Sequence, residues 1–264
     1  MLKAILYYIL FLAEYLITIF LGGFLVGLYM AMNMHSGSHN QQIEGLEESI
    51  YPFMIVIGFL GILIVWLTFG YYKFSRFSLG KVVPAAKWKA MTICTIPILG
   101  FTMVFYSIMN LFHLDFLPKQ MMEMSYLGFL PWNIIGSFIS VYIFFGAIQE
   151  ELIRCGKKRW VQLLTLSIMM LPACMMSVTP SGDINVDLTV LGFITLCYCS
   201  WIYGKTRSTI ILIVLYFVSN LVPFHFESKV LGILLLIAGT ALTIGGFAAL
   251  SRKLPEMLVK DEDE

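Results

Sequence analysis

The sequence predicts an all-α, polytopic membrane protein with about eight transmembrane helices and both termini in the cytoplasm. Three observations carry this prediction: an excess of apolar residues, eight long apolar segments, and a strong concentration of basic residues in alternate connections. Of the 264 residues, 59% are hydrophobic and only 12% are charged, whereas soluble domains are about 45–50% apolar and about 25% charged. A soluble fold of this length could not bury such a surplus, so we expect it to face lipid.

Eight apolar segments set the expected number of helices. They cover residues 5–32, 53–72, 91–112, 132–149, 160–178, 188–203, 209–224 and 230–250. Most have the roughly 17–25 residues that a helix needs to cross the hydrocarbon. Only residues 204–208 separate the sixth and seventh segments, so we expect a tight helical hairpin, broken by a glycine and two charges. The first segment exceeds the apolar part of a signal peptide, typically about 7–15 residues, so we expect it to be a retained helix.

The distribution of basic residues predicts the orientation. With the N-terminus inside, 15 of the 17 basic residues fall in cytoplasmic pieces, and only Lys119 and Lys229 fall outside. The inner ones are Lys3, Lys73, Arg76, Lys81, Lys87, Lys89, Arg154, Lys157, Lys158, Arg159, Lys205, Arg207, Arg252, Lys253 and Lys260. Cytoplasmic loops carry such an excess in membrane proteins. We therefore expect one multi-pass domain over residues 1–264 in the cell membrane, surrounded by the lipid bilayer and without a nucleic-acid partner.

Only a few of the polar residues in the apolar segments are candidates for a chemical function. A charged group inside a span is costly and is commonly functional, and Glu14 lies within the first segment. It could contact an ion or substrate, as in a small transporter, or be a protonated carboxyl bonded within the bundle. The sequence has no inverted repeat, which argues against a transporter. His35 and His39 flank a Ser-Gly-Ser stretch that disfavours a helix, and the five cysteines form no CxxC pair, so we expect no metal and no cofactor.

The fourth apolar segment ends in a pair of glutamates. Residues 146–156 read Gly-Ala-Ile-Gln-Glu-Glu-Leu-Ile-Arg-Cys-Gly, which taken alone can be a charged helix end. Glu150 and Glu151, followed by Gly156, are similar to the Glu-Glu-x-x-x-Arg motif of the CAAX protease and bacteriocin-processing (CPBP) family of intramembrane endopeptidases. Residues 201–208, Trp-Ile-Tyr-Gly-Lys-Thr-Arg-Ser, resemble the region that precedes the family's His-x-x-x-Asn motif. The resemblance covers residues 132–222.

The chain departs from the family pattern at the residues that perform the chemistry. Cys155 holds the position of the motif arginine, and Arg154, one residue early, would point about 100° away on a helix. Met175 stands nearest to the histidine of the second motif. Tyr216 replaces the histidine of the third motif, while Asn220 is kept.

The resemblance implies that a glutamate of this pair, with Glu150 the candidate here, would activate a water molecule with the help of a histidine. A second histidine and the asparagine would stabilise the oxyanion. Met175 cannot exchange a proton, and the phenol of Tyr216 is a poor base at neutral pH. We therefore expect a degenerate family member without efficient catalysis, which binds a peptide or another membrane protein in immunity or regulation. The alternatives are an active intramembrane endopeptidase with a variant site of Glu150, Glu151, Tyr216 and Asn220, and the small transporter.

Overall fold

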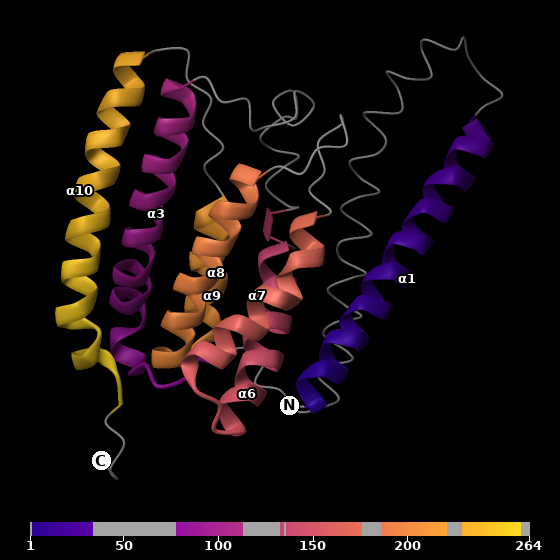
Figure 1. Ribbon diagram of the computed structural model, residues 1–264, viewed down its shortest axis with the longest axis horizontal. Helices are drawn as coiled ribbons and strands as arrows, with labels where there is room; N and C mark the ends of the chain where they lie inside the picture. The colour runs from indigo at the N-terminus through magenta and orange to yellow at the C-terminus, as the bar shows by residue number, and fades with distance from the viewer. Residues whose placement is uncertain are drawn as a thin grey trace.

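A computed structural model shows the chain as a bundle of helices (Figure 1). The structure describes residues 2–33, 78–112, 133–134, 136–175, 186–220 and 229–259. Within these ranges all regular elements are helical, and the only strand-like pairing is an isolated bridge between Val82 and Leu258. The predicted all-α class is confirmed for this part of the chain.

The helices occupy the described parts of seven of the eight predicted segments, and the segment at 53–72 lies outside the described residues. The elements are α1 (Leu2–Asn33), η1 (Pro84–Ala86), α3 (Lys87–Leu111), η2 (Val141–Gln149), α6 (Glu150–Arg154), α7 (Arg159–Met175), α8 (Val186–Thr206), α9 (Thr209–Asn220), α10 (Lys229–Lys253) and η3 (Pro255–Met257). Each of these seven apolar runs is therefore helical where the structure describes it, and the helix ends that are described lie within a few residues of those expected, except at the α8–α9 turn, as detailed below.

Three helices in the described ranges are long and apolar enough to cross a membrane. They cover Pro84–Leu111, Gly136–Arg154 and Lys229–Lys253. This is fewer than the eight predicted, so the number eight stays a prediction. The surface of α10 carries exposed apolar side chains along its length, including Ile237 and Ile244.

The centre of the bundle is a π-helix. All nine residues of η2 are buried, and this helix contacts α1, α7, α8 and α9. A helix that is apolar on all sides belongs in a core. Its i→i+5 hydrogen bonds are rare in proteins, and where they do occur they are frequently near functional sites. Nothing in the apolar pattern of residues 132–149 predicted them. η2 continues directly into α6, which begins at Glu150.

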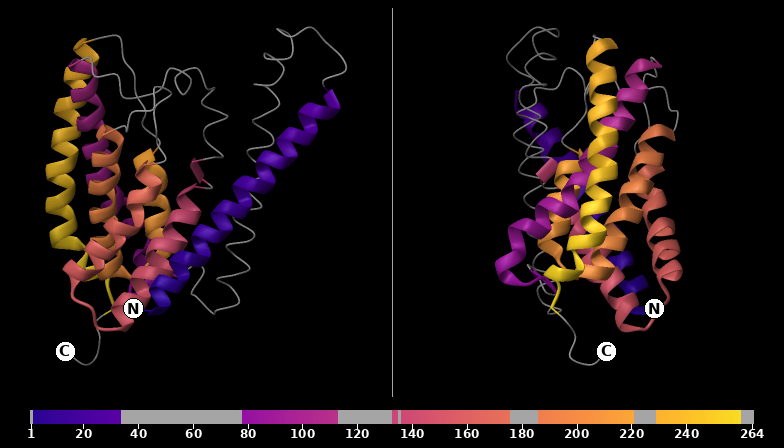
Figure 2. Two further views of the ribbon diagram at one scale, coloured as in Figure 1. Left: turned by 45° about the vertical axis from the view of Figure 1, so that its right-hand side comes forward. Right: turned by 90° about the vertical axis from the view of Figure 1, so that its left-hand side faces the viewer.

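The helices α3 and α10 lie side by side (Figures 1 and 2) and approach closely at glycines. A Cβ atom on Gly239 would lie 2.8 Å from the carbonyl oxygen of Gly100, and one on Gly100 would lie 2.6 Å from the amide nitrogen of Thr243. Small residues allow such contact between backbones in membrane helices. This pair forms one side of the bundle, and α1 lies at the other.

The basic residues gather at one end of the bundle, which we call the basic end. Of the described lysines and arginines, only Lys229 lies elsewhere, at the start of α10. The others lie at the starts of α1 and α3, in the α6–α7 connection, at the α8–α9 turn and at the end of α10. The start of α1 and the end of α10 lie at this same end (Figure 1). The arrangement agrees with the alternation of charge in the sequence.

The α8–α9 hairpin forms as expected, but its break lies later than expected. α8 continues through Gly204 and Lys205 to Thr206, so neither the glycine nor the first charge ends it. The chain turns at Arg207, which adopts a left-handed conformation with φ of 52°, and α9 starts at Thr209. A helix commonly ends where one residue becomes left-handed, and the residue is usually glycine.

Candidate functional site

The carboxylate of Glu150 is the centre of a charged cluster at the basic end. Arg207 donates from Nη1 to Oε2 of Glu150 over 2.7 Å, and the hydroxyl of Tyr203 donates to the same oxygen over 3.0 Å. Arg154 donates from Nε to the other oxygen, Oε1, over 3.3 Å. Both carboxylate oxygens of Glu150 therefore accept bonds from the protein itself.

The partners of Glu150 come from two elements. Arg154 lies four residues later on α6, a spacing that brings side chains together on a helix. It thus contacts Glu150 although it is one residue early for the family motif. Tyr203 lies at the end of α8 and is buried, and the amide of Arg207 donates to the carbonyl of Tyr203 over 2.8 Å. The α8–α9 turn is thus bonded to the end of the central helix.

The left-handed turn at Arg207 is covered by the chain segment that precedes α3. The amide of Lys81 donates to the carbonyl of Thr206 over 2.7 Å. Gly80, with φ of +60°, lies so close that a Cβ atom there would collide with the backbone of Thr206 and Arg207. A left-handed conformation without room for a side chain requires glycine. Gly80 therefore helps to place the guanidinium that neutralises Glu150.

The C-terminal segment holds this cover in place. The amide of Val83 donates to the carbonyl of Met257 over 3.0 Å, and the amide of Val259 donates to the carbonyl of Lys81 over 2.7 Å. Val82 and Met257 are both buried. Residues 81–83 and 257–259 thus form a short backbone pairing that connects the end of α10 to the cluster.

A second polar group lies one residue before Glu150. Gln149 is 1% exposed and donates from Nε2 to Oε1 of Gln162 over 3.2 Å and to the carbonyl of Ser200 over 2.9 Å. Gln162 in turn donates to the carbonyl of Lys157 over 2.7 Å. The Oε1 atom of Gln149 is buried and accepts no hydrogen bond within the described residues. These bonds tie together η2, α7, α8 and the connection after α6.

Glu151, the second glutamate of the motif, lies outside this cluster. Its Oε1 accepts a weak bond from Sγ of Cys155 over 3.8 Å, in an exposed part of α6. The Glu150 and Glu151 side chains thus have different partners. Within the described ranges, no group of three or more His, Cys, Asp or Glu side chains could hold a metal ion.

Tyr216 lies far from Glu150 along the bundle. Gly146 packs opposite Thr209 at the start of α9, since a Cβ on Gly146 would lie 3.8 Å from the Thr209 methyl group. Near the other end of α9, the carbonyl of Phe217 accepts a bond of 3.3 Å from Nδ2 of Asn133. Tyr216 is therefore near the level of Asn133, and Glu150 lies beyond the start of α9. At about 1.5 Å per helical residue, Tyr216 and Glu150 are therefore separated along the bundle axis by on the order of 20 Å.

The remaining predicted site residues cannot be compared in this way. Glu14 lies in α1, Met175 ends α7 and Asn220 ends α9, but the side chains of all three lie outside the described part of the structure. Their predicted roles stay predictions.

Comparisons with known proteins add no relative. No family model, no curated protein and no solved structure matches the chain.

The sequence did not predict that Tyr203 of α8 and Arg207 of the α8–α9 turn contact Glu150. Tyr203 and Arg207 lie four residues apart at the end of an apolar segment, but Arg207 is left-handed and lies just past the end of α8, so helical spacing gave no signal for this pair. The contact of Gln149 with Gln162 and Ser200 had no signal in the sequence either, because it depends on how three helices pack.

Proposed function

We propose that the chain is a multi-pass protein of the cell membrane with about eight helices and its basic end in the cytoplasm. The three long apolar helices and the exposed apolar surface of α10 support a membrane location. The gathering of lysines and arginines at one end supports the orientation, because cytoplasmic segments carry the excess of these residues. Cell fractionation tests the location, and labelling of cysteines placed at each end of α10 from outside the cell tests the orientation.

We further propose that the protein is a non-catalytic relative of the CPBP endopeptidases that binds a peptide or another membrane protein. The observation that carries this proposal is that both oxygens of the Glu150 carboxylate accept hydrogen bonds from the protein itself, from Arg207, Tyr203 and Arg154. A general base must accept a proton from a water molecule within hydrogen-bond reach. A carboxylate held by two guanidinium groups and a phenol is instead a structural ion-pair partner.

The distance along the bundle between Glu150 and Tyr216 supports the same proposal. In an active variant site, Tyr216 would donate to an oxyanion beside the attacking water, and such a donor must lie about 2.7–3.1 Å from that oxygen. The pairing of α9 with the helix before Glu150 leaves Tyr216 at another level. The resemblance at residues 146–156 and 201–208 would then reflect a shared frame whose chemistry has been replaced by an ion pair.

Cleavage assays in lipid vesicles separate this function from the active endopeptidase. Purified protein should release no fragments from membrane-embedded peptides whose cleavage site lies at the cytoplasmic face. Glu150→Gln should leave the background level of fragment release unchanged. The control is Glu151→Gln, which alters the neighbouring carboxylate and leaves the Arg207 pair intact. Turnover that depends on Glu150 would overturn the proposal in favour of a variant catalyst.

A further inference from the structure

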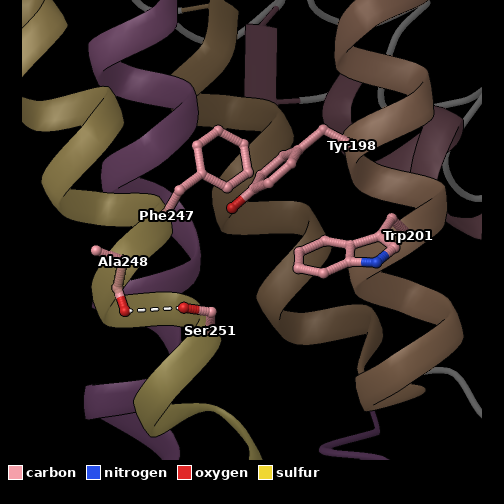
Figure 3. A pocket seen from close by; sticks show the side chains of 5 residues that line it. All are labelled: Tyr198, Trp201, Phe247, Ala248 and Ser251. Atoms are coloured by element: carbon pink, nitrogen blue, oxygen red, sulfur yellow. Dashed lines mark hydrogen bonds between the residues drawn. The ribbon is translucent and has the colours of Figure 1, made fainter.

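An apolar groove lies between α8 and α10, on the outside of the bundle near the basic end. Its lining consists of Tyr198 and Trp201 from α8 and Phe247, Ala248 and Ser251 from α10 (Figure 3). The groove has a volume of about 610 Å³, within the range of about 300–1,000 Å³ that is common for ligand pockets. It is open at the side, and Phe247 is 46% exposed.

The aromatic side chains give the groove a firm apolar wall. The ring of Tyr198 packs edge-on against that of Phe247 at 5.7 Å and lies 6.1 Å from that of Trp201. The Tyr198 hydroxyl points away from the wall and donates to the carbonyl of Cys94 on α3 over 2.7 Å. The polar atoms that Figure 3 shows on α10 are the Ser251 hydroxyl and the Ala248 carbonyl oxygen, and they are paired with each other, because the hydroxyl donates to the carbonyl over 3.0 Å. Such a wall suits a hydrocarbon chain.

A positive charge lies at the end of the groove that is nearer the membrane surface. The Lys205 ammonium lies 4.9 Å from the centre of the Trp201 ring, and Lys205 is one helical turn closer to the basic end than Trp201. Its side chain forms no ion pair within the described residues. Arg252 and Lys253, both exposed, follow Ser251 at the end of α10. A tryptophan with a lysine beside it is typical of the level where hydrocarbon meets headgroups.

We propose that this groove binds an anionic phospholipid from the leaflet at the basic end. One acyl chain lies against Tyr198 and Phe247, and the phosphate lies beside Lys205. Basic pockets between helices on the cytoplasmic side of membrane proteins recognise anionic headgroups. The inference rests on the membrane location proposed above, and it is independent of whether Glu150 is catalytic.

Quenching of Trp201 fluorescence by brominated phospholipids tests the proposal. The protein carries Trp201 as its only tryptophan after replacement of Trp66, Trp88, Trp132 and Trp160 by Phe, and it is reconstituted in vesicles with either brominated phosphatidylglycerol or brominated phosphatidylcholine. Phosphatidylglycerol should quench at about a five-fold lower mole fraction, the factor that one basic residue contributes near an anionic surface. Lys205→Gln should remove this preference, while Lys158→Gln, in the exposed α6–α7 connection, should not.

Filling the groove is the second arm. Ala248→Phe should weaken quenching by both lipids, because it occupies the space of the acyl chain. Ala238→Phe is the matched control: it is the same change on the same helix at another exposed position, about 15 Å along the axis. Equal quenching by the two lipids, or a preference that survives Lys205→Gln, would overturn the proposal.

Other occupants give distinct results. If inorganic phosphate at matched ionic strength abolishes the preference, the groove binds a free anion and the proposal is wrong. If neither lipid quenches Trp201 and Ala248→Cys crosslinks two copies, the groove is a contact between copies. If the protein does not float with vesicles at all, the membrane location fails, and this proposal fails with it.

Native mass spectrometry of the unaltered chain and of Lys205→Gln gives the same comparison without tryptophan replacements: the unaltered chain should retain more phosphatidylglycerol.

Discussion

The guanidinium of Arg207 and the carboxylate of Glu150 are 2.7 Å apart and join the α8–α9 turn to the end of the central helix. The two side chains are 26% and 19% exposed, so water screens the pair only in part. The second pair of the same carboxylate, with Arg154, involves a side chain that is 59% exposed. Glu150 thus has one partly buried partner, Arg207, and one exposed partner, Arg154. Their contributions to stability should therefore differ measurably.

Arg207→Gln should lower stability more than Arg154→Gln. The first change removes a partly buried charged hydrogen bond, which contributes about 1.5–3 kcal/mol, whereas the exposed i,i+4 pair contributes about 0.3–0.5 kcal/mol. Thermal unfolding in detergent or lipid should therefore show a clear fall in Tm for Arg207→Gln and a small one for Arg154→Gln. Adding Glu150→Gln to each should show strong coupling only with Arg207. Equal effects of the two arginines would contradict the assignment.

Gly80→Ala should destabilise the basic end more than Gly156→Ala. Both glycines have positive φ, at +60° and +66°, so both substitutions carry the same left-handed strain of roughly 1–2 kcal/mol. A Cβ atom on Gly80 would also collide with the backbone of Thr206 and Arg207, while one on Gly156 would meet open space. The overpacking adds about 1–3 kcal/mol. The measurement is Tm. Similar decreases in Tm for both variants would mean that the segment before α3 does not pack closely against the α8–α9 turn.

Gly239→Ala and Gly245→Ala should change stability in opposite directions. Alanine at an exposed helical glycine is favourable by about 0.5–1 kcal/mol, and a Cβ on Gly245 has no neighbour within 4 Å. A Cβ on Gly239 would lie 2.8 Å from the backbone oxygen of Gly100, so α3 and α10 would have to separate. Chemical unfolding of the two variants should give a gain for Gly245→Ala and a loss for Gly239→Ala. A gain for both would show that the two helices do not approach closely at Gly100.

Removal of residues 254–264 should expose the segment before α3 to proteases. The truncation deletes the backbone partners of Lys81 and Val83 and the buried side chain of Met257. Limited proteolysis followed by mass spectrometry should reveal new cleavage near residues 78–83. Removal of residues 260–264 alone keeps these bonds and is the control. Unchanged resistance after the longer truncation would mean that the pairing is dispensable.

The positions of the described helices agree with those predicted from hydropathy, a prediction that rests on the long apolar runs and internally satisfied backbones of any chain that crosses a bilayer. α10 begins one residue before the predicted segment at 230–250 and ends only where Arg252 and Lys253 make the chain polar. The hairpin at residues 204–208 was expected for the same reason. Its exact break was not, because glycine and lysine both fit within a helix whose last turn packs against other segments, as α8 does here.

The candidate site was predictable only in part. The glutamates were found from their sequence motif, and Glu150 does lie at the centre of a polar cluster. Its ion pair with Arg207 was not foreseeable, because the pair depends on a left-handed residue that is not glycine and on Gly80 from a distant segment. The spacing of residues in the sequence also could not predict how far Tyr216 lies from Glu150 along the bundle. That distance depends on how α9 packs against the helix that begins near Asn133.

The π-helical run at Val141–Gln149 has a consequence for how this chain tolerates change. Each hydrogen bond there encloses one more residue than in an α-helix, so the segment winds more slowly between Asn133 and Glu150. Loss of a single residue could convert it to α-helix and would rotate Glu150 relative to Asn133. Deletions and insertions within 141–149, more than conservative substitutions, are therefore the genetic changes expected to uncouple the Glu150–Arg207 pair while leaving hydropathy intact. Any comparison of this chain with a homologue should allow a one-residue gap in that segment.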